Sequence, residues 1–198
     1  MLKVLYSPAS PYSAKVRMAA AYAGVELEAV IVETSAEPVE LIGANPLGKI
    51  PVIVTDEGEA IYDSRAITQY LNRVSGGQLF SRNSSKRTEA ERLEALADGI
   101  ADCALAHVYE RRSRPEEAVY QPWLDKQWAK VIRGLDHINA SPPKLGKRLT
   151  AGHIALRATL AYLDLRFAGK WEKGRSRLTR WAARFDEKFP ELQSLLPS

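Results

Sequence analysis

SPASPYSAKVR, residues 7–17, is the stretch that decides how this chain folds. It follows an apolar run at Leu2–Tyr6 that is typical of a strand, and it leads into a helix-like run at Val16–Ala23. A group at the end of such a strand lies where the next helix exposes free N–H groups, which together with the helix dipole favour a thiolate. The chain places Ser10 and Ser13 there and no cysteine. A thiolate held at this point must therefore belong to a small molecule.

Strand and helix patterns alternate through the first part of the chain and then give way to helices alone. We expect strands at 2–6, 28–32, 52–55 and 59–62, helices at 13–23 and 64–72, and a helical turn at 39–42. Helical patterns then cover 86–112, a helix starting at Pro115, 154–167, and a segment around Trp181 and Phe185. The order βαβ followed by ββα predicts a mixed four-stranded sheet packed against helices. The chain is thus predicted to be α+β, with domains 1–75 and 86–198 joined by a linker at 76–85.

The composition indicates which cell compartment and which kinds of functional site to expect. Hydrophobic residues make up 45% and charged residues 26%, which is ordinary for a globular protein. No run is long enough to span a membrane and no signal peptide is evident, so we expect a cytoplasmic protein that does not bind membranes. Cys103 is the only cysteine, and the three histidines lack ligand spacing, so we predict neither a disulfide nor a metal site.

Positive charge is concentrated in the last third of the chain. Residues 144–188 carry twelve Lys/Arg and four Asp/Glu, net +8, against +4 for the whole chain. Arg177, Arg180 and Arg184 recur at helical spacing, opposite an apolar face, which indicates a solvated helix surface. No recognition motif accompanies the charge, so we expect no nucleic-acid partner. The alternative is an anion or nucleic-acid site on this surface, to which Arg175 would also contribute.

Three motifs together resemble the soluble glutathione S-transferase family, and its bacterial members in particular. They are Ser10-Pro11-Tyr12-x-x-Lys15-Val16-Arg17, Asn45-Pro46-Leu47-Gly48-Lys49-Ile50-Pro51-Val52 and Asp63-Ser64-Arg65-Ala66-Ile67. The resemblance covers the whole chain. It implies a thioredoxin-like N-terminal domain that binds glutathione as co-substrate, an all-helical C-terminal domain that holds an electrophile, and a homodimer.

The resemblance also assigns the glutathione-binding residues. It implies a cis peptide bond between Ile50 and Pro51, beside which an extended ligand pairs with the backbone. Lys49 would lie near the glycyl carboxylate of glutathione. Asp63 and Ser64 would hold the ammonium and carboxylate of the γ-glutamyl end, and Ser64 would in addition cap the helix that follows.

Ser10 is the predicted catalytic residue. A hydroxyl that donates a hydrogen bond to sulfur favours the thiolate and lowers a thiol pKa from its usual value of about 8.5. Ser13 or a backbone N–H could supply the same stabilisation, Tyr6 is a weaker rival, and Ser10 could serve only as a helix cap. Serine cannot form the mixed disulfide that cysteine-bearing members use, so thiol–disulfide exchange is disfavoured.

The second-substrate pocket is assigned by position only. We expect it between the domains, lined by Pro11, His107, Tyr109 and Arg111, and we expect Cys103 to be an inert packing residue. The predicted function is addition of glutathione to an electrophile, that is, a glutathione transferase. The alternatives are a glutathione-dependent peroxidase or reductase on the same site, and a non-catalytic ligand-binding or interaction module with this fold.

A capping-box segment is expected at the start of the third helix of the C-terminal half. Thr150 matches the cap position, and the family usually has Asp three residues later, where this chain has His153. We expect histidine not to return the hydrogen bond to the cap, which predicts a weaker cap.

Overall fold

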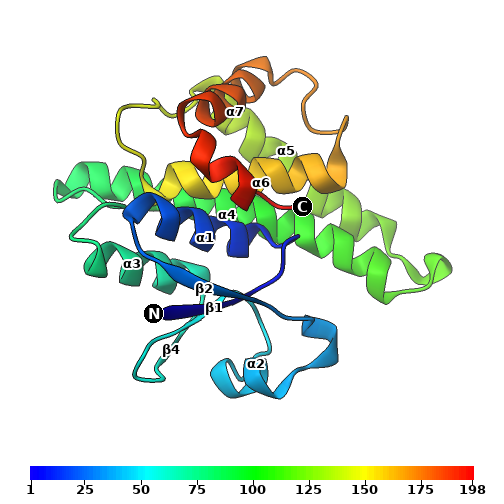
Figure 1. Cartoon of the computed structure of the whole chain (residues 1–198). Coiled ribbons are helices and arrows are strands. Elements are labelled where there is room, and N and C mark those ends of the chain that lie inside the picture. The colour runs from blue at the N-terminus through cyan, green and yellow to red at the C-terminus, as the bar shows by residue number, and fades with distance from the viewer.

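The computed structural model describes all 198 residues as a small sheet covered by a mainly helical body (Figure 1). The strands are β1 (Leu2–Tyr6), β2 (Leu27–Ile31), β3 (Val52–Val54) and β4 (Ala60–Ile61). The helices are α1 (Pro11–Ala23), α2 (Val39–Ala44), α3 (Ser64–Val74), α4 (Ser84–Ser113), α5 (Gln121–Ala140), α6 (Ala151–Phe167) and α7 (Ser176–Lys188). Short 3-10 segments lie at Thr34–Ala36, Glu116–Ala118 and Pro190–Leu195. No helix combines the length and apolar character needed to cross a membrane.

The sheet has the strand order β2-β1-β3-β4, with β1 and β2 parallel and the other two pairs antiparallel. Side chains alternate between its faces, as the strand pleat requires. Val4 and Ile53 join the main core beneath α1 and α3, whereas Leu5 and Val52 form a small separate cluster on the side of α2. The sheet of mixed strand direction and the helical second half confirm the predicted α+β fold class.

Helix α6 is the centre of the helical part and is buried along nearly its whole length. It packs on both α4 and α1, so it ties the sheet half of the chain to the helical half (Figure 1). Gly152 allows the closest approach, because a Cβ atom there would lie 2.6 Å from the carbonyl oxygen of Ala90 in α4. One apolar cluster runs from Val4 in β1 to Leu192 near the C-terminus. The two halves of the chain therefore share a continuous core.

The main differences from the sequence expectation lie around Pro115 and in the expected linker. Pro115 does not start a long helix; it precedes the short 3-10 segment Glu116–Ala118, and α5 begins only at Gln121. The expected linker is also less loose than its Ser/Gly-rich composition indicates. Leu79 and Phe80 are buried, and both of their backbone N–H groups donate to Oδ1 of Asn72, at 3.0 and 2.9 Å.

A cluster of buried charges joins α1 to the helical half. Lys15 is 1% exposed, and its Nζ lies 2.9 Å from both carboxylate oxygens of Asp98 and 3.3 Å from Oε1 of Glu94. Nε of Arg65 donates to the same Asp98 at 2.8 Å, and Oγ1 of Thr68 donates to Glu94 at 2.8 Å. Burial raises the pKa of Glu94, and the Lys15 charge opposes that rise. A buried carboxylate pair of this kind is tolerated only because cations neutralise it.

The capping box at the start of α6 corrects the expectation for His153. Oγ1 of Thr150 accepts from the His153 N–H at 3.4 Å, and Nδ1 of His153 accepts from the Thr150 N–H at 3.1 Å. A neutral imidazole with its proton on Nε2 can act as that acceptor, which the expectation overlooked. Burial lowers the pKa of His153, so the neutral form is the favoured one in the folded chain.

We predict that His153 makes the fold less stable in mild acid. Because its pKa is lowered on folding, the unfolded chain takes up a proton below about pH 6.5 that the folded chain does not. The free energy of unfolding should therefore fall as pH drops through this window. Replacement by Asp keeps an acceptor at this position and should remove that part of the slope. Urea unfolding of both chains at pH 7.5 and 5.5 tests this, and equal pH dependence would contradict it.

We also predict that Lys15→Met destabilises the fold by about 3–5 kcal/mol, because it leaves buried Glu94 without its cation and Asp98 with Arg65 alone. Adding Glu94→Gln should recover a large part of this loss, since the amide carries no charge and can still accept from Thr68. Denaturant unfolding of the single and double variants measures both values. A double variant less stable than Lys15→Met would show that the charge imbalance is not the cause.

Candidate functional site

Ser10 lies at the N-terminus of α1, directly after the loop that follows β1. It is the helix cap: its Oγ accepts from the Ser13 N–H at 3.2 Å, and Pro11 fills the first helical position. That bond occupies a lone pair only, and the Ser10 hydroxyl hydrogen has no acceptor in the protein. Ser13 is completely buried, whereas Ser10 is partly exposed. Of these two serines, Ser10 is the one that a ligand can reach.

Tyr6, the weaker rival, belongs to the core. It is 8% exposed, and the guanidinium of Arg17 covers its ring at 4.3 Å from the centroid. Tyr12 is also occupied, because its hydroxyl donates to a carboxylate oxygen of Asp102 in α4. Burial and then Asp102 raise the pKa of Tyr12 well above its usual range. Tyr12 is therefore not an open hydrogen-bond donor comparable to Ser10, and Tyr6 differs from Ser10 in that its ring is packed in the core.

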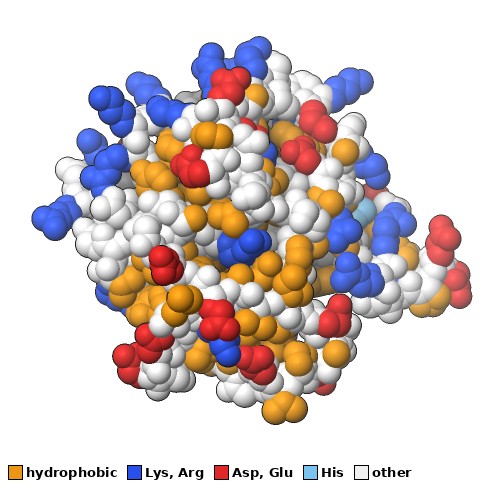
Figure 2. Space-filling model, viewed as in Figure 1, with side chains coloured by type: hydrophobic (Ala, Val, Ile, Leu, Met, Phe, Trp, Pro, Cys, Tyr) orange, Lys and Arg blue, Asp and Glu red, His pale blue; other side chains and the backbone are white.

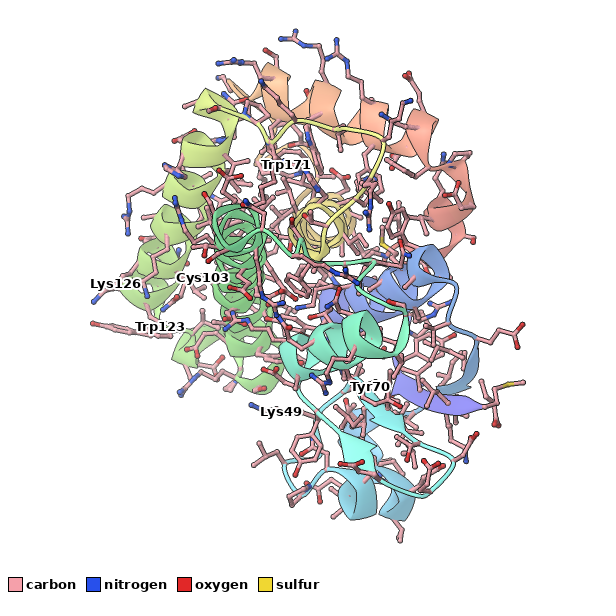
Figure 3. All side chains as sticks on the ribbon, turned by 90° about the vertical axis from the view of Figure 1, so that its left-hand side faces the viewer. Lys49, Tyr70, Cys103, Trp123, Lys126 and Trp171 are labelled. Carbon is pink, nitrogen blue, oxygen red and sulfur yellow. The ribbon has the colours of Figure 1, made fainter.

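The segment Lys49-Ile50-Pro51 is held by Asn45. The Asn45 side chain is buried; it accepts from the Leu47 N–H at 3.1 Å and donates to the carbonyl oxygen of Lys49 at 2.8 Å. The peptide bond between Ile50 and Pro51 is cis, as the family resemblance implies. The Lys49 side chain is exposed and has no partner in the protein, and Figure 3 shows it extending away from the sheet.

The structure corrects the expectation of which residue caps α3. Asp63, not Ser64, is the cap of α3, because its Oδ1 accepts from the Arg65 N–H at 3.0 Å. Ser64 is the first helical residue, is 4% exposed and makes no side-chain hydrogen bond within the protein. The hydroxyl of Ser64 is therefore free of a capping duty, and it lies beside the unpaired N–H groups of a helix N-terminus.

The buried charge cluster brings the starts of α1 and α3 together. Lys15 follows Ser10 by five residues, Arg65 comes directly after Ser64, and both cations contact Asp98. Two helix N-termini, each with a serine that can still donate a hydrogen bond, thus meet at one end of the sheet. Both helix dipoles favour negative charge there. The arrangement suits a ligand with an anionic group at each end.

The four expected pocket residues do not share one surface. Tyr109 is 51% exposed and lies two helical turns from Asp102, on the same face of α4. His107 lies instead against the rings of Trp128 and Phe167, at 6.1 and 5.4 Å. Nη2 of Arg111 donates to Gln121 of α5 at 3.1 Å, and Pro11 is buried at the start of α1. The structure brings only Tyr109 to the exposed face that continues from Asp102.

Two groups considered for other chemistry are placed in ordinary surroundings. Cys103 lies within the helical part and is partly buried (Figure 3), and burial raises the pKa of its thiol, which favours the inert protonated form. Burial and then Arg111 lower the pKa of His107. The structure holds no group of three His, Cys, Asp or Glu side chains that could bind a metal ion.

Sequence reasoning missed Lys15, Glu94, Asp98 and Tyr12 as residues that shape the site. A signal existed: Glu94, Asp98 and Asp102 recur every four residues and so lie on one face of a helix. That acidic row requires a cation from another helix wherever it is buried, and Lys15 lies between the apolar residues Ala14 and Val16.

Comparison with known proteins identifies the family of the chain. Residues 9–74 match the family model of the glutathione S-transferase N-terminal domain, and residues 121–184 match that of the C-terminal domain. A glutathione S-transferase from Methylobacillus flagellatus, solved with glutathione bound, is 32% identical with a TM-score of 0.90, and the match covers 100% of both chains. A glutathione transferase family member from Pseudomonas fluorescens, also solved with glutathione, is 33% identical with a TM-score of 0.90 over 100% of both.

Among curated proteins, the GST-like protein YibF of Escherichia coli is 39% identical over 93 residues, which is 46% of each chain. The chain spans less than half the length of the curated relatives it matches. The solved structures, in contrast, match from end to end at more than 30% identity. By this full-length match, the chain belongs to the glutathione S-transferase family.

Proposed function

We propose that this chain binds glutathione, stabilises its thiolate with Ser10 and adds it to an electrophile. The observation that carries the proposal is the uncommitted hydroxyl hydrogen of Ser10 at the N-terminus of α1. The glutathione found in two full-length structural neighbours supports it. Asp63 and Ser64 would hold the γ-glutamyl end, and Lys49, Ile50 and Pro51 would hold the remainder of the peptide.

The chemistry needs a donor rather than a base. The glutathione thiol loses its proton to solvent, and the Ser10 O–H donates a hydrogen bond to the resulting thiolate. The sulfur lone pair then forms a bond to the electrophilic carbon, while a leaving group departs or an adjacent double bond takes up the electron pair. No covalent bond to the protein forms, because Ser10 cannot make a disulfide with the ligand.

The second substrate would lie against the exposed face of α4 that carries Tyr109. We propose that Tyr109 forms a wall of this pocket and that buried Pro11 forms its base. His107 and Arg111 would not contact the substrate; they would hold α4 against α5 through Trp128 and Gln121.

The homodimer remains a prediction, which sedimentation velocity would test. A calorimetric titration with reduced glutathione and with its S-alkylated form tests the proposal directly. Failure of both ligands to bind would refute it.

We predict that Ser10→Ala lowers kcat/KM with an electrophilic substrate by about 10- to 100-fold, because a hydrogen bond to a charged sulfur contributes roughly 1.5–3 kcal/mol. Binding of S-alkylglutathione should persist, and the pKa of the bound thiol, followed by thiolate absorbance, should rise. Ser7→Ala is the matched control, since the Ser7 side chain makes no hydrogen bond. A loss of less than about threefold would contradict the catalytic role.

We further predict that Ser64 and Asp63 can be separated by experiment. Ser64→Ala should weaken glutathione binding by about tenfold without lowering stability, because Asp63 supplies the cap. Asp63→Ala should both weaken binding and lower the free energy of unfolding by about 1 kcal/mol. Calorimetry and urea unfolding give the two readouts. Unchanged glutathione affinity in Ser64→Ala would exclude its hydroxyl from the site.

A further inference from the structure

A basic groove lies on the helical half, between α7 and the chain that connects α5 to α6. Its volume is about 860 Å³, within the range of small-molecule sites. Five cations line it together with a single carboxylate: Lys144, Arg177, Arg180, Arg184, Lys188 and Glu187. In Figure 2, Lys and Arg side chains gather along the edge of the molecule where α7 lies in Figure 1. The groove is separate from the Ser10 site, which lies at the end of the sheet.

The cations of the groove are not neutralised by the protein. Arg177, Arg180, Arg184 and Lys188 follow one another at three- and four-residue steps along α7, so like charges face each other on successive turns. None of them forms an ion pair, and Glu187 pairs with none. Like charges at this spacing repel one another, and a bound anion would offset that repulsion.

Arg175 does not belong to this surface, contrary to the sequence alternative. It is 8% exposed, its Nη2 lies 2.8 Å from Oδ1 of Asp136, and its Nη1 donates to the carbonyl oxygen of Trp171 at 2.7 Å. Arg175 therefore has a structural role. Of the four arginines in that alternative, Arg177, Arg180 and Arg184 line the groove.

The groove is held in shape by hydrogen bonds across it. Nε1 of Trp181 donates to the carbonyl oxygen of Pro143 at 2.7 Å, which fixes the connecting chain against α7. Nη1 of Arg177 donates to the last carbonyl of α5, that of Ala140, at 2.6 Å. Arg180 and Arg184 have no partner in the protein at all. The walls are thus preformed, and two guanidinium groups one turn apart are left to bind a ligand.

We propose that this groove binds a small molecule with a run of phosphate groups. Guanidinium groups pair with phosphate oxygens through two parallel hydrogen bonds, and several adjacent cations match several adjacent phosphates. A nucleic acid fits less well, because Trp181 is 5% exposed and no exposed aromatic ring in the groove is available to stack on a base. The half-buried Pro142, Pro143 and Leu145 give the groove one apolar wall.

The test is calorimetric titration with tripolyphosphate and with ATP at low and physiological salt. We expect both to bind, and tighter binding of ATP would show that the apolar wall contacts the nucleoside. Arg180→Gln with Arg184→Gln should weaken binding at least about tenfold. The matched control is Arg133→Gln with Lys170→Gln, which removes the same charge from exposed positions outside the groove and should change affinity less than twofold.

Three outcomes would overturn the proposal. The first is that neither probe binds. The second is that the control pair weakens binding as much as the groove pair, which would show that only net charge matters. The third is that a single-stranded oligonucleotide binds and tripolyphosphate fails to displace it. Saturating S-alkylglutathione should leave phosphate affinity unchanged, because the two sites are separate. The result is therefore independent of whether the proposed transferase activity is found.

Discussion

The position of the candidate site depends on one buried cation. Lys15 cannot lie in the interior unless carboxylates neutralise it, and those carboxylates come from α4. This requirement fixes the rotation of α1 about its axis and its height against α4. Ser10 begins the same helix, so the location of its hydroxyl follows from the ion cluster rather than from the loop before it. Asp98 extends the constraint to α3 through Arg65.

The free N–H groups at the two helix N-termini of the site are capped in different ways. At α3 the cap is supplied by Asp63, which leaves the neighbouring Ser64 hydroxyl without a partner. At α1 a single hydroxyl does both jobs, because Ser10 accepts one hydrogen bond as a cap and retains a proton to donate. A local helix requirement and a binding requirement are thus met by the same few atoms, which explains why hydroxyl and carboxylate side chains recur at these junctions.

Most of the fold was predictable from local patterns. The alternation around β1 and α1 and the helical periodicity of α4 and α6 follow from spacing alone, and the motifs identified the family. Lys15, Glu94 and Asp98 were not predicted, because a charged residue in a helix is ordinarily solvated and burial is decided by elements distant in sequence. His153 was misjudged for another reason: its ring nitrogen can accept as a carboxylate does when the imidazole is neutral.

The close contact of the α6 backbone with α4 at Gly152 determines how the two halves of the chain unfold. No layer of solvent or flexible connection separates the sheet half from the helical half, since α1 and α6 belong to the same apolar cluster. Either half alone would expose a large apolar face, and the charges of Lys15, Glu94 and Asp98 would lose their partners. We therefore expect the chain to unfold as a single cooperative unit despite its two family domains.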